Sequence, residues 1–251
     1  MAKIVSIHSF RGGTGKSNTT ANVAALLADS GRRVGVIDAD IQSPGIHVLF
    51  GIPGEDVGAS LNDFLWGSRE IRDVAVDVTN GAGDAGGRLF LIPSSMQPGE
   101  ITRVLRDGYD PHRLTTGLRQ LVDDLSLDVL LIDTHPGLNE ETLLSLVLSH
   151  TLLIVMRPDE QDYEGTGITA RVARELDVPQ IHIMVNKAPA ELDAEHVEER
   201  VRTAFGCSVA AVLPHSDELM RLASAGIFSQ RFPNHPLTDL YRRVAHVVAD
   251  E

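Results

Sequence analysis

Short runs of apolar, largely β-branched residues recur along the chain and alternate with longer stretches of helical periodicity. Most of these runs are continuous rather than alternating, which is typical of parallel strands buried on both faces. The predicted strands span residues 3–9, 33–38, 88–93, 128–133, 151–156, 181–186 and 208–213. The predicted helices span residues 16–30, 112–126, 138–149, 165–176, 193–204, 216–225 and 237–249.

Strands that alternate with helices in this way predict an α/β fold. We expect a single domain over residues 1–251, with a doubly wound, mostly parallel sheet of about seven to eight strands and helices on both faces. Residues 73–79 indicate one extra strand, and the glycine-rich stretch 81–87 is typical of a flexible loop. The chain shows no internal repeat and no linker that would divide it.

Composition narrows the class of protein. The 35 acidic and 22 basic residues give a net charge of -13, which argues against a wholesale coat on nucleic acid. The single cysteine, Cys207, excludes a disulfide framework and a paired-cysteine metal site. No apolar run approaches the roughly 20 residues that cross a bilayer, and the N-terminus lacks a signal-peptide pattern. A soluble, cytoplasmic protein is expected.

The segment 10–17, FRGGTGKS, follows a predicted strand and opens a predicted helix. Such a glycine-rich turn lets backbone N–H groups cradle phosphates at a helix N-terminus. Lys16 would then reach the β- and γ-phosphates of ATP, and the Ser17 hydroxyl would hold Mg²⁺. Phe10 stands where the strict phosphate-loop pattern has its first glycine. The residues expected to bind the nucleotide here are Gly12, Gly13, Thr14, Gly15, Lys16, Ser17 and Asn18.

Two acidic positions follow predicted strands and would face the same ligand crevice. Asp133 ends the strand 128–133, and we expect it to hold Mg²⁺ through water, since magnesium sites in proteins usually keep several water ligands. Asp40 follows the strand 33–38 and is a candidate to orient or activate the attacking water. The alternative for either aspartate is a cap of a helix or loop.

Together the three motifs resemble those of the deviant Walker A ATPases, the MinD/ParA family, over most of the chain. The family loop Lys-Gly-Gly-x-Gly-Lys-Ser/Thr corresponds to residues 11–17, its Asp-x-Asp switch to 38–40, and its second switch to 133–137, DTHPG. The resemblance implies an ATPase that forms a homodimer in its ATP state. It also implies that Asn186 and the segment around Pro214 contact adenine.

One departure from the family pattern bears on dimerisation. The family carries a signature lysine at the first loop position, where this chain has Arg11. In the family that lysine crosses the dimer interface to the partner's nucleotide. An arginine offers a bidentate fork for phosphate, so Arg11 is interpreted as a working, catalytic substitute. The alternative is that the contact between subunits is lost.

The resemblance implies a switch that binds Mg-ATP, dimerises and resets by slow, partner-stimulated hydrolysis while it positions or segregates DNA or a large cargo. An ATP-dependent synthetase or kinase, or a scaffold that binds ATP without hydrolysing it, are the alternatives. C-terminal arginines are candidates for non-specific DNA contact, with solvated helix faces as the equal alternative. They are Arg221, Arg231, Arg242 and Arg243.

Three further segments complete the sequence-based expectations. The helix 237–249 has the spacing of a packing face rather than of a membrane anchor. His135 is expected to be a solvent-facing loop histidine. The segment 157–163 is placed near the nucleotide or the dimer face, without an assigned role. Related proteins that hold iron–sulfur clusters use paired cysteines, which this chain lacks.

Overall fold

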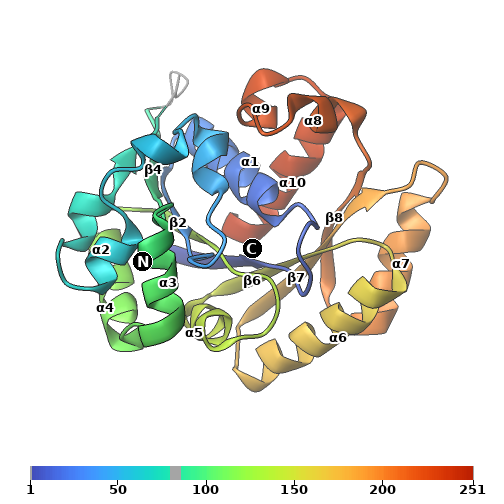
Figure 1. Cartoon of the computed structure of the whole chain (residues 1–251). Coiled ribbons are helices and arrows are strands. Elements are labelled where there is room, and N and C mark those ends of the chain that lie inside the picture. Colours follow the sequence, from blue (N-terminus) through green and yellow to red (C-terminus); the bar gives the residue numbers. More distant parts are fainter. Residues whose placement is uncertain (1, 80–85, 251) are drawn as a thin grey trace.

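The computed structural model describes residues 2–79 and 86–250, and these form a layered α/β structure around one eight-stranded sheet (Figure 1). The predicted loop at 81–87 falls largely outside the described residues. The strands are β1 Lys3–His8, β2 Arg33–Asp38, β3 Val76–Asp77, β4 Arg88–Ile92, β5 Val129–Asp133, β6 Thr151–Met156, β7 Gln180–Ala188 and β8 Ser208–Pro214. Their order across the sheet is β3-β4-β2-β5-β1-β6-β7-β8.

All neighbouring strands run parallel except the β3–β4 pair at the edge, which is antiparallel. The predicted mostly parallel, doubly wound sheet is therefore confirmed. The extra strand expected within 73–79 exists, although it is only two residues long. Because β1 lies at the centre between β5 and β6, the segment that follows it opens onto the crevice where parallel sheets bind ligands.

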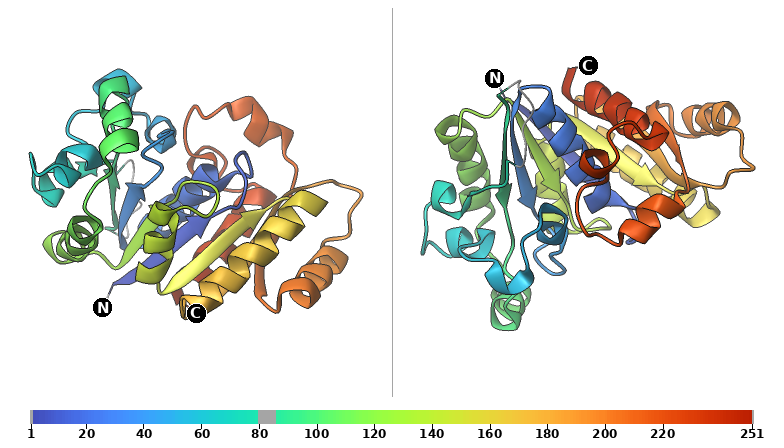
Figure 2. Two further views of the ribbon diagram at one scale, coloured as in Figure 1. Left: turned by 60° about the horizontal axis from the view of Figure 1, so that its bottom comes forward. Right: turned by 90° about the horizontal axis from the view of Figure 1, so that it is seen from above.

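Helices cover both faces of the sheet (Figure 2). One face carries α1 and α10, whose side chains share a core with the sheet. On the opposite face, α2 and α4 pack over one half of the sheet and α6 and α7 over the other. The helices are α1 Lys16–Asp29, α2 Leu61–Leu65, α3 Pro98–Asp107, α4 Pro111–Asp124, α5 Glu140–Leu148, α6 Glu160–Glu175, α7 Ala194–Phe205, α8 Asp217–Leu222, α9 Phe228–Arg231 and α10 Pro236–Asp250. Short 3₁₀ turns cover Ile46–Phe50, Gly54–Asp56 and Ile71–Val74.

The seven predicted helices are all present, but the sequence pattern missed α2, α3 and α9 and placed the start of α6 five residues late. The true start of α6 is capped by Asp159, whose side chain accepts a hydrogen bond from the Asp162 N–H. Gly165 and Gly167, which weaken a helical pattern, obscure that start. Helix α3 was missed because its apolar stripe is short, formed by Ile101, Val104 and Leu105, and only Val104 is buried.

The last helix packs into the core, as its spacing predicted. Leu237, Tyr241, Val244 and Val248 of α10 are at most 2% exposed and join the cluster that covers α1. No helix in the described part of the chain has the length and apolar character that a bilayer crossing requires.

Candidate functional site

The phosphate loop spans residues 9–15 between β1 and α1, at the centre of the sheet. Gly13 and Gly15 adopt φ values of 78° and 100°, in the left-handed region that favours glycine. A Cβ atom on Gly15 would come within 2.3 Å of the Asn186 Nδ2 atom. That nitrogen donates to the Thr14 carbonyl at 2.7 Å, and Lys187 Nζ donates to the Gly13 carbonyl at 2.8 Å. The end of β7 therefore fixes the shape of the loop.

Phe10 takes the place of the usual first glycine without disturbing the loop, because a glycine elsewhere makes room for its ring. A Cβ atom on Gly165 of α6 would lie 2.1 Å from the Phe10 Cδ1 atom. The ring therefore packs directly against the bare backbone of α6. This contact joins the base of the loop to the helix that follows β6.

Lys16 and Asp133 form a buried ion pair at the mouth of the loop. The Lys16 Nζ lies 3.1 Å from Asp133 Oδ1, and the two side chains are 8% and 1% exposed. The Thr20 hydroxyl donates to the same carboxylate oxygen at 3.1 Å. The structure thus places Lys16 and Asp133 side by side at the end of the sheet where the sequence predicted a ligand crevice, while their roles toward phosphate and Mg²⁺ stay predictions.

The oxygen donors beside the loop suit Mg²⁺ rather than a transition metal. Ser17 is the second residue of α1, after Lys16, and Asp133 is the last residue of β5, the strand beside β1. Across the described residues, no group of three or more His, Cys, Asp or Glu side chains has metal-site geometry. A hard cation held by one hydroxyl, one carboxylate, water and nucleotide oxygens matches that donor set. Ser17 and Asp133 remain the residues expected to hold it.

Asp38 is fully buried at the end of β2, where it pairs in register with Asp133. Its two carboxylate oxygens accept hydrogen bonds from the Gly45 N–H at 3.1 Å and the Asp40 N–H at 3.2 Å. Burial, followed by the negative charge of Asp133, raises the pKa of Asp38 to about 8. At neutral pH the nucleotide-free protein therefore holds a proton on this side chain.

The proton on Asp38 makes stability depend on pH. Between pH 4 and 8 the folded protein binds this proton and the unfolded chain does not, so the free energy of unfolding falls as pH rises, by up to about 1.4 kcal/mol per unit. We expect Asp38→Asn to flatten this slope, while it lowers stability at pH 5 because the amide has one acceptor fewer. Urea unfolding of the nucleotide-free protein from pH 4.5 to 8.5 measures the slope. The exposed Asp124→Asn is the control, and an unchanged slope in Asp38→Asn would contradict the expectation.

Asp40 is held by a residue from the other switch segment. The Nδ1 atom of His135 lies 2.6 Å from Asp40 Oδ1, and a carboxylate oxygen can only accept, so the imidazole donates. The His135 side chain is 23% exposed and that of Asp40 13%. The expectation of a solvent-facing His135 was wrong, because pairing with Asp40 turns the ring into the crevice. The pair joins the segments after β2 and β5.

A second histidine lies at the site, and the sequence pattern did not identify it as a site residue. His8 ends β1 beneath the loop, is fully buried, and pairs through Nδ1 with the Thr134 Oγ1 atom at 2.8 Å. Burial, followed by the charge of Lys16, lowers the pKa of His8 to about 3. The imidazole is therefore neutral at physiological pH. A single histidine in an apolar strand gives no hint of this position before the fold is known.

The Arg11 side chain is held by carboxylates of its own chain. Its Nη1 atom is 3.3 Å from Asp159 Oδ1 and 3.3 Å from Asp162 Oδ1. Arg157 contacts the same two carboxylates, at 3.2 and 3.3 Å. Asp162 is 2% exposed, whereas the Arg11 side chain is 37% exposed. The segment 157–163, which had no assigned role, thus forms a carboxylate clamp on Arg11.

The two residues expected at the adenine lie beyond the loop. Both ends of the Asn186 amide are used within the protein, because its Oδ1 also accepts the Lys187 N–H at 2.9 Å. Pro214 ends β8, next to an open cavity of about 630 Å³ whose lining includes Lys187 and His215. Asn18 lies in the first turn of α1. Contacts of Asn18, Asn186 and Pro214 with a nucleotide stay predictions.

Comparison with known proteins agrees with this geometry. Residues 2–182 match a family model described as an AAA domain. An iron–sulfur cluster carrier protein of Pseudomonas fragi is 31% identical, over 96% of this chain and 83% of its own length.

Two solved structures show the same fold. The septum site-determining protein MinD of Pyrococcus horikoshii, in complex with Mg-ADP, superposes with a TM-score of 0.82 at 21% identity, covering 100% of this chain and 97% of its own. A ParA family ATPase of Chlorobium tepidum gives 0.78 at 18% identity, covering 98% and 99%. With the phosphate loop, the two switch aspartates and this sheet in place, the chain belongs to the MinD/ParA family of P-loop ATPases.

Proposed function

We propose that the protein is an ATP-dependent molecular switch that forms a homodimer when it binds Mg-ATP and separates after slow hydrolysis. The observation that carries this proposal is the position of Arg11. Its guanidinium is paired with the carboxylates of Asp159 and Asp162, and its side chain remains 37% exposed. An exposed arginine beside the loop suits the nucleotide of a second subunit better than the nucleotide of its own.

The remaining site residues divide the work of hydrolysis. Lys16 neutralises phosphate charge, and Ser17 with Asp133 holds Mg²⁺, which stabilises charge on the transferred phosphoryl group. Asp40 orients the attacking water, with His135 fixing the carboxylate. In the dimer, Arg11 leaves the carboxylates of Asp159 and Asp162 and binds a phosphate of the partner's nucleotide. This change of partner links nucleotide binding to dimerisation. MinD in complex with Mg-ADP supports the choice of nucleotide and metal.

Arg11→Ala is expected to weaken the ATP-dependent dimer by at least about thirtyfold, because the loss of one buried charged contact at an interface costs about 2–5 kcal/mol. Light scattering with ATP, ADP and no nucleotide measures the dimer. Arg11→Lys should keep it, and Arg202→Ala, an exposed and ion-paired arginine on α7, is the matched control. An ATP-dependent dimer of unchanged strength in Arg11→Ala would remove the role of Arg11 across the interface.

The proposed task is to position or segregate DNA or a large cellular body, with a partner protein that stimulates hydrolysis. A complex of MinC with MinD is known for Aquifex aeolicus, which supports a protein partner. The arginines considered for DNA contact are mostly paired with acids: Arg221 with Asp217, Arg242 with Asp239 and Arg243 with Glu198. These exposed pairs are weak, so they reduce but do not cancel the positive charge available for DNA.

Two other functions have less support. A metabolic synthetase would need ATP turnover to depend on a small substrate, whereas a switch responds to a partner protein. The iron–sulfur carrier function of the Pseudomonas fragi relative is not proposed for this chain. Cys207 is the sole cysteine of this chain and is buried, and burial raises the pKa of its thiol. A cluster requires several thiolate ligands.

A further inference from the structure

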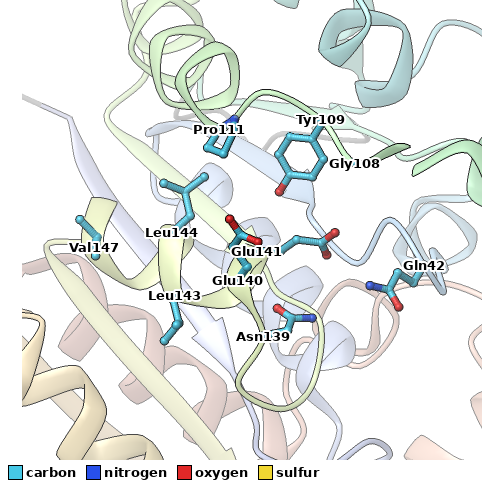
Figure 3. A pocket seen from close by; sticks show the side chains of 10 residues that line it. All are labelled: Gln42, Gly108, Tyr109, Pro111, Asn139, Glu140, Glu141, Leu143, Leu144 and Val147. Carbon is cyan, nitrogen blue, oxygen red and sulfur yellow. The ribbon is translucent and has the colours of Figure 1, made fainter. Parts of the chain in front are cut away.

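A cavity of about 500 Å³ lies beside the two switch segments and outside the phosphate loop. Three parts of the chain form it: the segment after Asp40, the connection from α3 to α4, and α5 (Figure 3). Its volume falls within the range of sites that bind small molecules. No residue of the loop itself lines it.

The cavity has an apolar side and a polar end. Figure 3 shows Leu143, Leu144 and Val147 of α5 gathered on one side, and the Tyr109 hydroxyl and the Gln42 amide toward the other. Val147 is 56% exposed and marks the open part of the apolar wall. A ligand that matches this lining has an apolar body and one polar end.

The polar end carries negative charge without a matching cation. Glu140 and Glu141 both line the cavity, and no lysine or arginine does. The Gln42 side chain interacts with the Glu141 carboxylate and favours its charged form, while the buried Oε2 atom of Glu141 has no hydrogen-bond partner within the described chain. Burial raises the pKa of Glu141, and burial followed by the charges of Glu141 and Glu140 raises the pKa of Tyr109. Glu140 is exposed and Glu141 partly buried, so both carboxylates are accessible to a cation that also donates hydrogen bonds.

We propose that this cavity binds a small amphipathic organic cation, an ammonium or guanidinium group carried on an apolar chain. The cationic end meets Glu140 and Glu141, and the apolar chain lies along Leu144 and Val147. One ligand of this kind thus brings positive charge and hydrogen-bond donors to the glutamates and apolar surface to the leucine and valine side chains.

The position of the cavity connects it to hydrolysis, a step that rests on the proposed ATP switch. Gln42 follows Asp40 by two residues, and the Thr142 hydroxyl donates to the carbonyl of His135 at 3.3 Å. Glu141 also lies within electrostatic range of Asp40 and His135. A cation bound here changes the charge around the Asp40–His135 pair, so the ligand regulates ATP turnover.

The binding test uses the whole nucleotide-free protein and two probes of the same shape, 4-phenylbutylammonium and neutral 4-phenylbutanol. Calorimetric titration is expected to show one saturable site for the cation, in the millimolar range or tighter for a ligand of this size. The alcohol should bind at least about tenfold more weakly, because it cannot pair with a carboxylate. Equal binding of the two probes, or no saturation by the cation, would overturn the proposal.

Variants locate the site. Glu141→Gln should weaken binding of the cation by at least about tenfold. Glu195→Gln is the matched control, since Glu195 is likewise an acidic residue in the first turn of a helix, but on α7. Val147→Trp fills the apolar side at an exposed position and should abolish binding; cation binding unaffected by both cavity variants would place the ligand elsewhere. Because binding is measured without ATP, a protein that fails to dimerise or hydrolyse leaves this result intact, and turnover with and without the cation tests the regulatory step separately.

Discussion

Lys16→Met is expected to reduce ATP turnover by at least about a hundredfold, the loss typical when one preorganised charge on the reacting group is removed. It should also destabilise the nucleotide-free protein. In that state Lys16 neutralises Asp133, which is 1% exposed, and an uncompensated buried carboxylate costs about 3–5 kcal/mol. The same lysine therefore supports both the reaction and the resting structure of the site.

Separate measurements distinguish the two effects of Lys16. Urea unfolding of the nucleotide-free protein reports the stability, and steady-state phosphate release reports the turnover. The double variant Lys16→Met/Asp133→Asn should recover most of the stability, since both charges are gone, yet remain inactive. Turnover in Lys16→Met within about threefold of the wild type would contradict the phosphate role, because a missing charge in a dry site costs far more.

The sheet could be predicted because its strands carry the burial pattern in their own sequence. Residues such as those of β5 and β6 are buried throughout, and continuous apolar runs report that directly. The elements that were missed bury few side chains or are very short, as in α3, where only Val104 is buried. The hydrophobic pattern of a segment therefore predicts its secondary structure only where most of its apolar side chains are buried.

In the candidate site, too, the residues in local motifs could be placed from sequence, and the contacts between distant segments could not. Lys16 and Asp133 could be placed in one crevice from sequence, because a phosphate loop and a strand-end aspartate are each local motifs that meet at one sheet edge, but their ion pair was not predicted. The clamp of Asp159 and Asp162 on Arg11 joins residues about 150 positions apart, in segments that no motif connects. His135 was misplaced for the same reason, since its partner Asp40 lies 95 positions earlier. Contacts of this kind appear only once the strand order is known.

Asp40→Asn is expected to lower ATP turnover by about a hundredfold or more, with ATP affinity changed only a few-fold. The asparagine has nearly the same shape, but it cannot accept a proton from water, and general-base assistance contributes about 10²–10⁴ to a rate. The Lys16–Asp133 ion pair, which lies on the phosphate side of the site, is left intact. Turnover and affinity should therefore separate in this variant, whereas both should fall in Lys16→Met.

His135→Gln tests how the carboxylate is held. The 2.6 Å contact makes His135 a positioning residue, so its loss should lower kcat by about tenfold and leave nucleotide affinity unchanged, since one misplaced hydrogen bond costs less than the missing base. Single-turnover phosphate release and fluorescent-nucleotide binding provide the two readouts. If basal turnover survives in Asp40→Asn, Asp40 is a loop cap and another group orients the water. If the wild type itself shows no turnover alone or with partner proteins, the protein binds ATP as a sensor, and the Asp40–His135 pair serves to join its switch segments rather than to hydrolyse the nucleotide.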